Sequence, residues 1–81
     1  MPDTLARITA QLKNWYPWEV RPGIYVYWGE IYNDTMNRWT DGTVIHTSNV
    51  VSEETIEGRR LVHTLNSIYE LIGEELKHDQ S

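Results

Sequence analysis

The chain has no cysteine, so it forms neither a disulfide framework nor a cysteine-ligated zinc site. It also has no long apolar run: its longest stretches are far shorter than the roughly 20 residues that cross a bilayer. The first residues lack the basic and then apolar pattern of a secretion signal. We therefore expect a cytoplasmic protein in a reducing compartment, with no membrane partner.

Basic residues are few. Seven Lys and Arg stand against twelve Asp and Glu, which gives a formal net charge of −5. The basic residues are scattered and form no stripe, whereas binding to phosphate backbones depends on clustered Lys and Arg that displace counterions. The balance argues against a nucleic-acid partner and favours a protein with a basic surface.

The length of 81 residues leaves room for one hydrophobic core and no second domain. Apolar residues make up 40% and charged residues 23% of the chain, as in globular proteins. We therefore expect a single domain over residues 1–81.

A helix is predicted over residues 4–16, because four apolar residues recur at helical spacing. These residues are Leu5, Ile8, Leu12 and Trp15. Pro17 should end this helix, since proline has no N–H to donate and disfavours helical geometry in the residue before it.

Residues 23–72 predict an antiparallel sheet. A first strand runs from residue 24 to 32, and Asp41-Gly42 has the residues of a two-residue hairpin turn. A long strand over 43–51, an acidic loop over 52–58 and a strand over 59–65 follow. Residues 67–78 fit either a helix or a strand, and the favoured interpretation is a short last strand to about residue 72. Residues 73–81 read as an acidic tail. The fold class is α+β, with the N-terminal helix packed on four to five antiparallel strands, as an SH3-like or open meander arrangement.

Part of this region resembles a family of small phage and prophage accessory proteins. The sequence has W-T-D-G at 39–42, T-S-N-V at 47–50 and T-L-N-S-I-Y-E-L at 64–71. These match the W-x-D-G, T-S-x-V and T-x-N-S-x-Y-x-L elements of that pattern. The resemblance covers only the C-terminal half of the folded part. It implies a small β-sheet domain and a viral or prophage origin, and it carries no catalytic motif.

No motif predicts a reaction or a metal. Antiparallel pairing around the acidic loop would set His46 opposite His63, but two ligands are fewer than the three or four that zinc sites need. The carboxylates of Glu30 and Asp34 lie near a turn, where solvated acids are the simpler interpretation. No nucleophile elbow or phosphate loop is present. We expect no enzyme activity, no cofactor and no metal.

The aromatic content is unusual. There are four Trp and five Tyr but no Phe, and eight of these nine rings lie between Trp15 and Trp39. Tyr and Trp combine an apolar ring with a polar group and therefore suit protein contacts. In the first strand, Ile24, Val26 and Trp28 should face the helix, while the alternate residues face outward.

The outward residues predict a partner-binding patch of aromatic rings rimmed by acids. Its residues are Trp18, Tyr25, Tyr27, Glu30, Ile31, Tyr32, Asp34 and Asp41. We predict a non-enzymatic protein-binding module, a phage-borne inhibitor or modulator of a host protein such as a defence nuclease, similar to anti-CRISPR proteins. The alternatives are a small-ligand or glycan-binding domain, a single-stranded nucleic-acid binder that stacks bases on its rings, and self-association into a homo-oligomer through the same patch.

Overall fold

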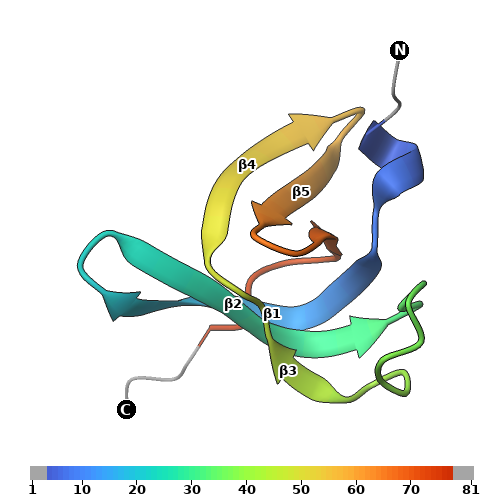
Figure 1. Ribbon diagram of the computed structural model, residues 1–81, viewed down its shortest axis with the longest axis horizontal. Helices are drawn as coiled ribbons and strands as arrows, with labels where there is room; N and C mark the ends of the chain where they lie inside the picture. Colours follow the sequence, from blue (N-terminus) through green and yellow to red (C-terminus); the bar gives the residue numbers. More distant parts are fainter. Residues whose placement is uncertain (1–3, 78–81) are drawn as a thin grey trace.

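The computed structural model describes residues 4–77, and this part of the chain is almost entirely β-structure (Figure 1). One short 3-10 turn, η1 (Thr4–Arg7), precedes the strands. The strands are β1 (Ala10–Arg21), β2 (Ile24–Tyr32), β3 (Val44–His46), β4 (Val50–Ile56), β5 (Arg59–Thr64) and β6 (Ile68–Leu71).

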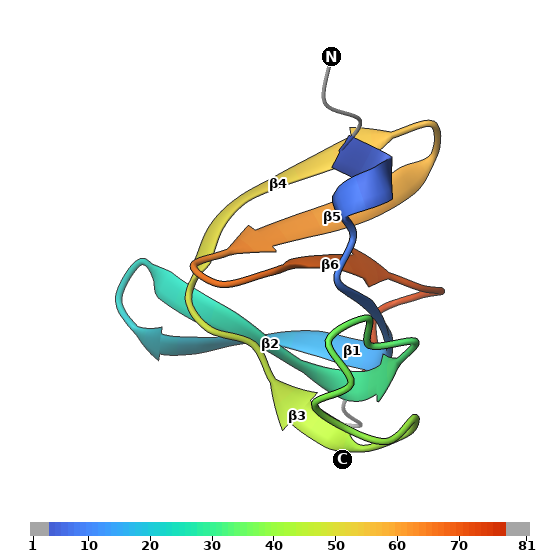
Figure 2. The ribbon, with the colours of Figure 1, turned by 45° about the vertical axis from the view of Figure 1, so that its right-hand side comes forward.

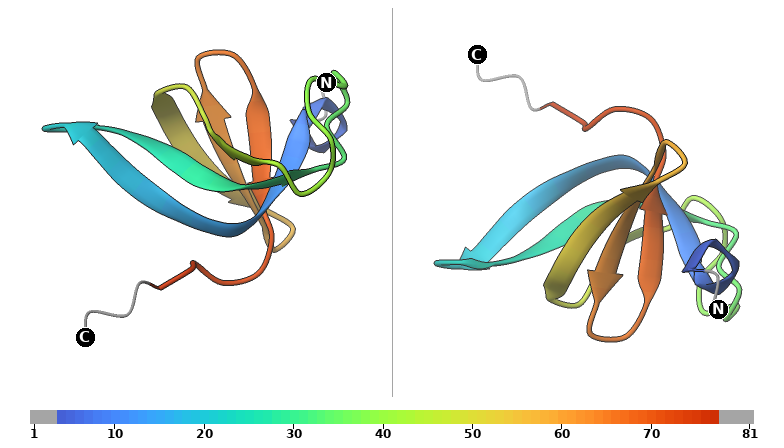
Figure 3. Two further views of the ribbon diagram at one scale, coloured as in Figure 1. Left: turned by 90° about the horizontal axis from the view of Figure 1, so that it is seen from below. Right: turned by 90° about the horizontal axis from the view of Figure 1, so that it is seen from above.

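The six strands form one mixed sheet in the order β3-β2-β1-β6-β5-β4. Each half of the sheet is a run of consecutive antiparallel strands, and the parallel pair β1–β6 joins the two halves (Figure 2). The sheet is strongly twisted, so that its two halves cross (Figure 3). Residues of β2 therefore contact β4, although three strands separate them in the sheet.

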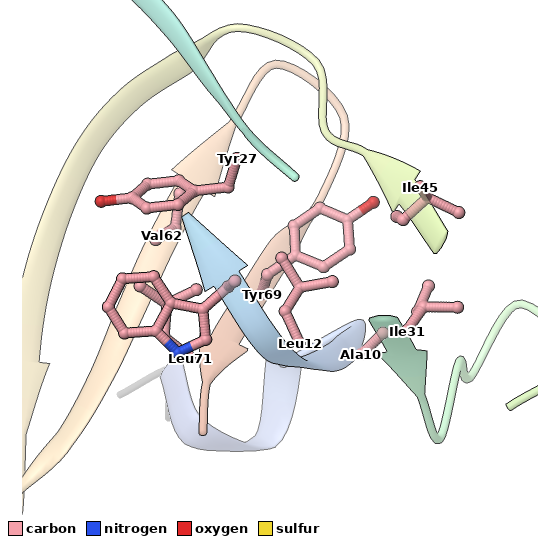
Figure 4. Packing of buried hydrophobic residues seen from close by; sticks show 9 residues of the cluster. Ala10, Leu12, Tyr27, Ile31, Ile45, Val62, Tyr69 and Leu71 are labelled. Atoms are coloured by element: carbon pink, nitrogen blue, oxygen red, sulfur yellow. The ribbon is translucent and has the colours of Figure 1, made fainter. Parts of the chain in front are cut away.

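The core lies on the concave face that this twist encloses (Figure 4). Leu12, Ile31 and Val62 are each 0% exposed, and burial of one such side chain contributes about 1.5–3 kcal/mol. Every strand except β4 supplies buried residues to the cluster: Ala10, Leu12, Trp15, Tyr27, Ile31, Ile45, Val62, Tyr69 and Leu71. The hydrophobic core is thus built by the sheet folding over itself.

The predicted helix over residues 4–16 is wrong, and with it the α+β class. Only η1 is helical, and residues 10–21 form β1. The helix-like spacing of Leu12 and Trp15 comes from a β-bulge: the β1–β2 register shifts between Lys13 and Tyr16, and Asn14 has a positive φ of 51°. The extra residue moves Trp15 onto the same buried face as Leu12.

Pro17 does not end an element, as the sequence suggested, but lies within β1 opposite Tyr27. The reason is that β6 pairs only with residues 10–12 of β1. The segment after β6 still reaches Trp15, whose carbonyl accepts a hydrogen bond from the N–H of Leu76. At Pro17 only β2 pairs with β1, and a proline is tolerated on such an edge because no partner needs its N–H.

The sheet also differs from the predicted meander. It has six strands, and its first and last strands pair in parallel. Asp41-Gly42 does not join two paired strands, since β3 pairs with β2 across the loop of residues 33–43. The predicted long strand over 43–51 is split between β3 and β4.

The predicted acidic loop over 52–58 belongs mostly to β4, and the turn is confined to Glu57-Gly58. Both turn residues have positive φ, 53° and 77°, as a two-residue hairpin turn of type I′ requires. The predicted last strand is confirmed as β6. Residues 73–77 form no strand or helix, and the rest of the predicted acidic tail, 78–81, lies outside the described residues.

Candidate protein-binding surface

The β1–β2 hairpin extends beyond the core as a two-stranded ribbon, most clearly seen in Figure 3. We call residues 16–28 the hairpin arm. Directly opposed residues of an antiparallel pair share a face, and the register pairs Tyr16 with Trp28 and Trp18 with Val26. These four side chains therefore lie together on the convex side of the arm, away from the core.

Strand β3 extends this face. His46 lies opposite Trp28, and its ring centroid is 4.9 Å from that of the indole, with the ring planes tilted by 51°. Val44, two residues earlier and on the same side, is 63% exposed. We call this surface the outer aromatic face, formed by Tyr16, Trp18, Val26, Trp28, Val44 and His46.

Trp18 is the outstanding residue of the outer aromatic face. Its side chain is 57% exposed, and its neighbour Val20 is 49% exposed, whereas Val26 beneath them is only 5% exposed. A large apolar ring in water on a projecting ribbon contributes little to the core. Such rings are typical of contact surfaces.

The opposite, concave side of the arm is closed by Glu53 of β4. Its carboxylate accepts a hydrogen bond from the Tyr27 hydroxyl at 2.8 Å and another from the Tyr25 hydroxyl. Arg60 pairs with the same carboxylate at 3.3 Å, and its guanidinium lies 5.1 Å from the centroid of the Trp15 ring. These contacts tie β2 to β4 and β5 across the concave face.

The two phenols respond to this environment. The hydrogen bond to Glu53, with partial burial, raises the pKa of Tyr25 to about 12. Burial and the same carboxylate raise the pKa of Tyr27 further. Both groups therefore stay protonated near neutral pH and act as hydrogen-bond donors to Glu53.

The predicted facing of β2 is reversed. Tyr27 is 2% and Ile31 0% exposed, and Tyr25 packs against the core cluster. No helix covers the other face. Trp28 lies there half-buried, and Val26 lies on the same side but is only 5% exposed. The sheet's own curvature buries the residues that we expected at the surface.

Asp34 does not belong to an exposed acidic rim. It is 7% exposed and pairs with Arg38, whose Nε lies 3.2 Å from Oδ2. Its carboxylate also accepts hydrogen bonds from the backbone N–H groups of Met36 and Arg38. Burial alone would raise the pKa of Asp34, but the Arg38 contacts outweigh it and lower the pKa. This carboxylate holds the loop of residues 33–43.

Of the other residues predicted for the patch, some lie close together and others do not. Glu30 and Tyr32 lie on the same side of β2 as Trp28, and the Tyr32 hydroxyl donates to Glu30 at 3.1 Å, which raises the pKa of that phenol. Asp41 lies in the loop, where it accepts a hydrogen bond from the N–H of Asn33 at 2.9 Å. Trp18 is near the tip of the arm and thus at the other end of β2 from these acids.

Sequence reasoning did not place Tyr16, Trp28 and His46 in the predicted patch. The alternation of Tyr16 and Trp18 would have indicated them once residues 10–21 were read as a strand. The partnership of Trp28 with His46 depends on the pairing of β3 with β2, which has no local signal.

His46 and His63 do not pair with each other. His46 lies opposite Trp28, while His63 lies opposite Ser52 and Ile68, and its Nε2 contacts the carboxylate of Glu54. Within residues 4–77 no three His, Asp or Glu side chains gather in the way that a metal ion requires. The same part of the chain contains no helix of the length and apolar character that a membrane crossing demands.

A hollow of about 550 Å³ lies between the β4–β5 turn and the segment after β6. Two of its charged residues are paired: Arg59 holds Glu70 through two nitrogens, each at 2.9 Å. This contact lowers the pKa of Glu70, and Gln11 donates a further hydrogen bond to the same carboxylate. The pairing of Glu70 with Arg59 and Gln11 stabilises the fold.

Comparisons with protein-family models, with curated proteins and with solved structures find nothing that matches this chain.

Proposed function

We propose that this protein is a non-enzymatic binding module that holds a partner protein through the outer aromatic face of its hairpin arm. The observation that carries the proposal is the 57% exposure of Trp18 on a ribbon that projects from the core. An indole in this position supplies a large contact area at a low cost in side-chain entropy.

The geometry favours a protein pocket over a stacking ligand. Trp18 is widely exposed, but the second indole on the face, Trp28, is half-buried and partly covered by His46. A single protruding ring flanked by Val20 suits insertion into an apolar pocket. A glycan or a nucleic-acid strand needs several open rings, and the net charge of −5 further opposes nucleic acid.

The resemblance in residues 39–71 suggests a phage-borne protein that inhibits or modulates a host protein such as a defence nuclease, in the cytoplasm of the host. The negative net charge suits a partner with a basic surface.

Affinity capture from cells that naturally contain the protein tests the proposal. Trp18→Ala should reduce recovery of the partner at least about tenfold, because truncation of a central indole costs about 2 kcal/mol or more. Leu65→Ala is the control, since Leu65 is also an exposed apolar residue, at 68%, but lies between β5 and β6 and is not part of the arm. Equal recovery with both variants would show that the outer aromatic face is not the contact surface.

A further inference from the structure

Strand β4 is an open edge of the sheet. It spans seven residues, Val50–Ile56, whereas the strand at the other end of the sheet, β3, spans only three. In the described part of the chain, no second strand pairs with β4 beyond β5, and residues 51–56 make no other backbone hydrogen bond. Unpaired edges of this length bind further strands unless something prevents it.

The backbone groups that face this open edge follow from the hairpin register. In a two-residue type I′ hairpin, the residues that flank the turn, Ile56 and Arg59, exchange hydrogen bonds with each other. Bonding alternates along the strand, so Thr55 and Glu53 direct their N–H and C=O groups outward. The register shift between Val50 and Ser52 bends the strand beyond that point.

The charge of Glu54 determines which kind of strand can pair with the β4 edge. If a second copy paired antiparallel through the outward groups of Glu53 and Thr55, the two-fold axis would set each Glu54 directly opposite the other. Like charges at directly opposed positions are destabilising. The side chain of Glu54 is 43% exposed, and its carboxylate contacts His63, so in such a pair the two exposed carboxylates would face each other.

We propose that the β4 edge binds an extended segment of a partner protein that places Lys or Arg opposite Glu54. The segment adds a seventh strand to the sheet, with main-chain bonds to Glu53 and Thr55. This site is separate from the outer aromatic face. Glu57, exposed in the adjoining turn, adds negative charge beside the same edge.

The test uses the full chain and two labelled peptides, one of alternating Lys and Val and one of alternating Glu and Val, with fluorescence anisotropy as the readout. The Lys peptide should bind at least about tenfold more tightly than the Glu peptide. Glu54→Lys should reverse that preference. Thr55→Pro should weaken binding at least about tenfold, since it removes an outward N–H that an edge strand can lose without unfolding, and Thr55→Val should bind as wild type does.

Amide hydrogen exchange provides a readout that does not depend on a variant. Saturating Lys peptide should slow exchange of the Glu53 and Thr55 amides at least about tenfold. Trp18→Ala should bind the peptide like wild type, so a failure of the outer aromatic face leaves this result intact. Unprotected amides, an unchanged preference in Glu54→Lys, or no binding up to about 1 mM peptide would overturn the proposal.

Discussion

The contact between Glu53 and the two tyrosines gives the sharpest prediction about stability. Glu53→Ala removes the acceptor for the hydroxyls of Tyr25 and Tyr27 and the partner of Arg60. Tyr27 is 2% exposed, so its hydroxyl would be left buried without its acceptor. The link between β2 and β4 across the concave face would then be lost.

The magnitude follows from these contacts. A hydrogen bond to a charged group contributes about 1.5–3 kcal/mol, while the Arg60 pair is half exposed on the arginine side and adds little. After allowance for the partly exposed Tyr25, we expect Glu53→Ala to lower the free energy of unfolding by about 3 kcal/mol. In a domain of this size that loss lowers Tm by about 12–24 °C.

Two variants act as controls. Glu53→Gln keeps an oxygen acceptor but loses the charge, and should cost about 1 kcal/mol. Glu54→Ala changes the neighbouring carboxylate on the opposite side of β4, and should cost less than about 1 kcal/mol. Urea and thermal unfolding followed by circular dichroism measure all three. If Glu53→Ala were as stable as Glu54→Ala, the link between β2 and β4 would not hold the sheet closed.

Three further predictions concern single groups. An absorbance titration at alkaline pH should find the Tyr25 phenol ionising near pH 12; because the folded pKa exceeds the unfolded value of about 10, its stabilisation is complete below pH 10 and is lost as pH rises through 12. Gly29→Ala should lower the free energy of unfolding by about 1–3 kcal/mol, since a Cβ there would lie 3.2 Å from the Cβ of Trp15, and urea unfolding measures this loss. Glu70 has a lowered pKa through its hydrogen bonds to Arg59, so its stabilisation is present above the unfolded pKa of about 4 and is lost as pH falls through the folded value; Arg59→Met should flatten that acid limb of the stability curve.

The sequence predicted the β-rich region and the last strand. The helix that it predicted over residues 4–16 is wrong. Leu12 and Trp15 are three apart and look helical, but the bulge at Asn14 places both on one face of a strand. A bulge of this kind cannot be distinguished from helical periodicity when only four apolar residues are available.

The prediction of which side of β2 is buried was wrong for a related reason. Apolar or aromatic residues occupy both sides of this strand, so alternation alone does not say which side is buried. The decision depends on the twist that brings β4 over Tyr25 and Tyr27, a contact between segments about 26–28 residues apart. Trp18 was predicted to be exposed, and this holds whichever side of β2 faces the core. Asp34 was wrongly predicted to be exposed, because its buried pair with Arg38 forms within a loop.

A photo-crosslinking residue placed at position 20, in cells that naturally contain the protein, tests the proposed binding through Trp18 most directly. Val20 adjoins Trp18 and is 49% exposed, so its replacement leaves the core intact. We predict one specific crosslinked partner that disappears when Trp18→Ala is added, and no such product from the same probe at position 65. Crosslinking to the same proteins from both positions, or a product that Trp18→Ala leaves unchanged, would contradict binding through the hairpin arm.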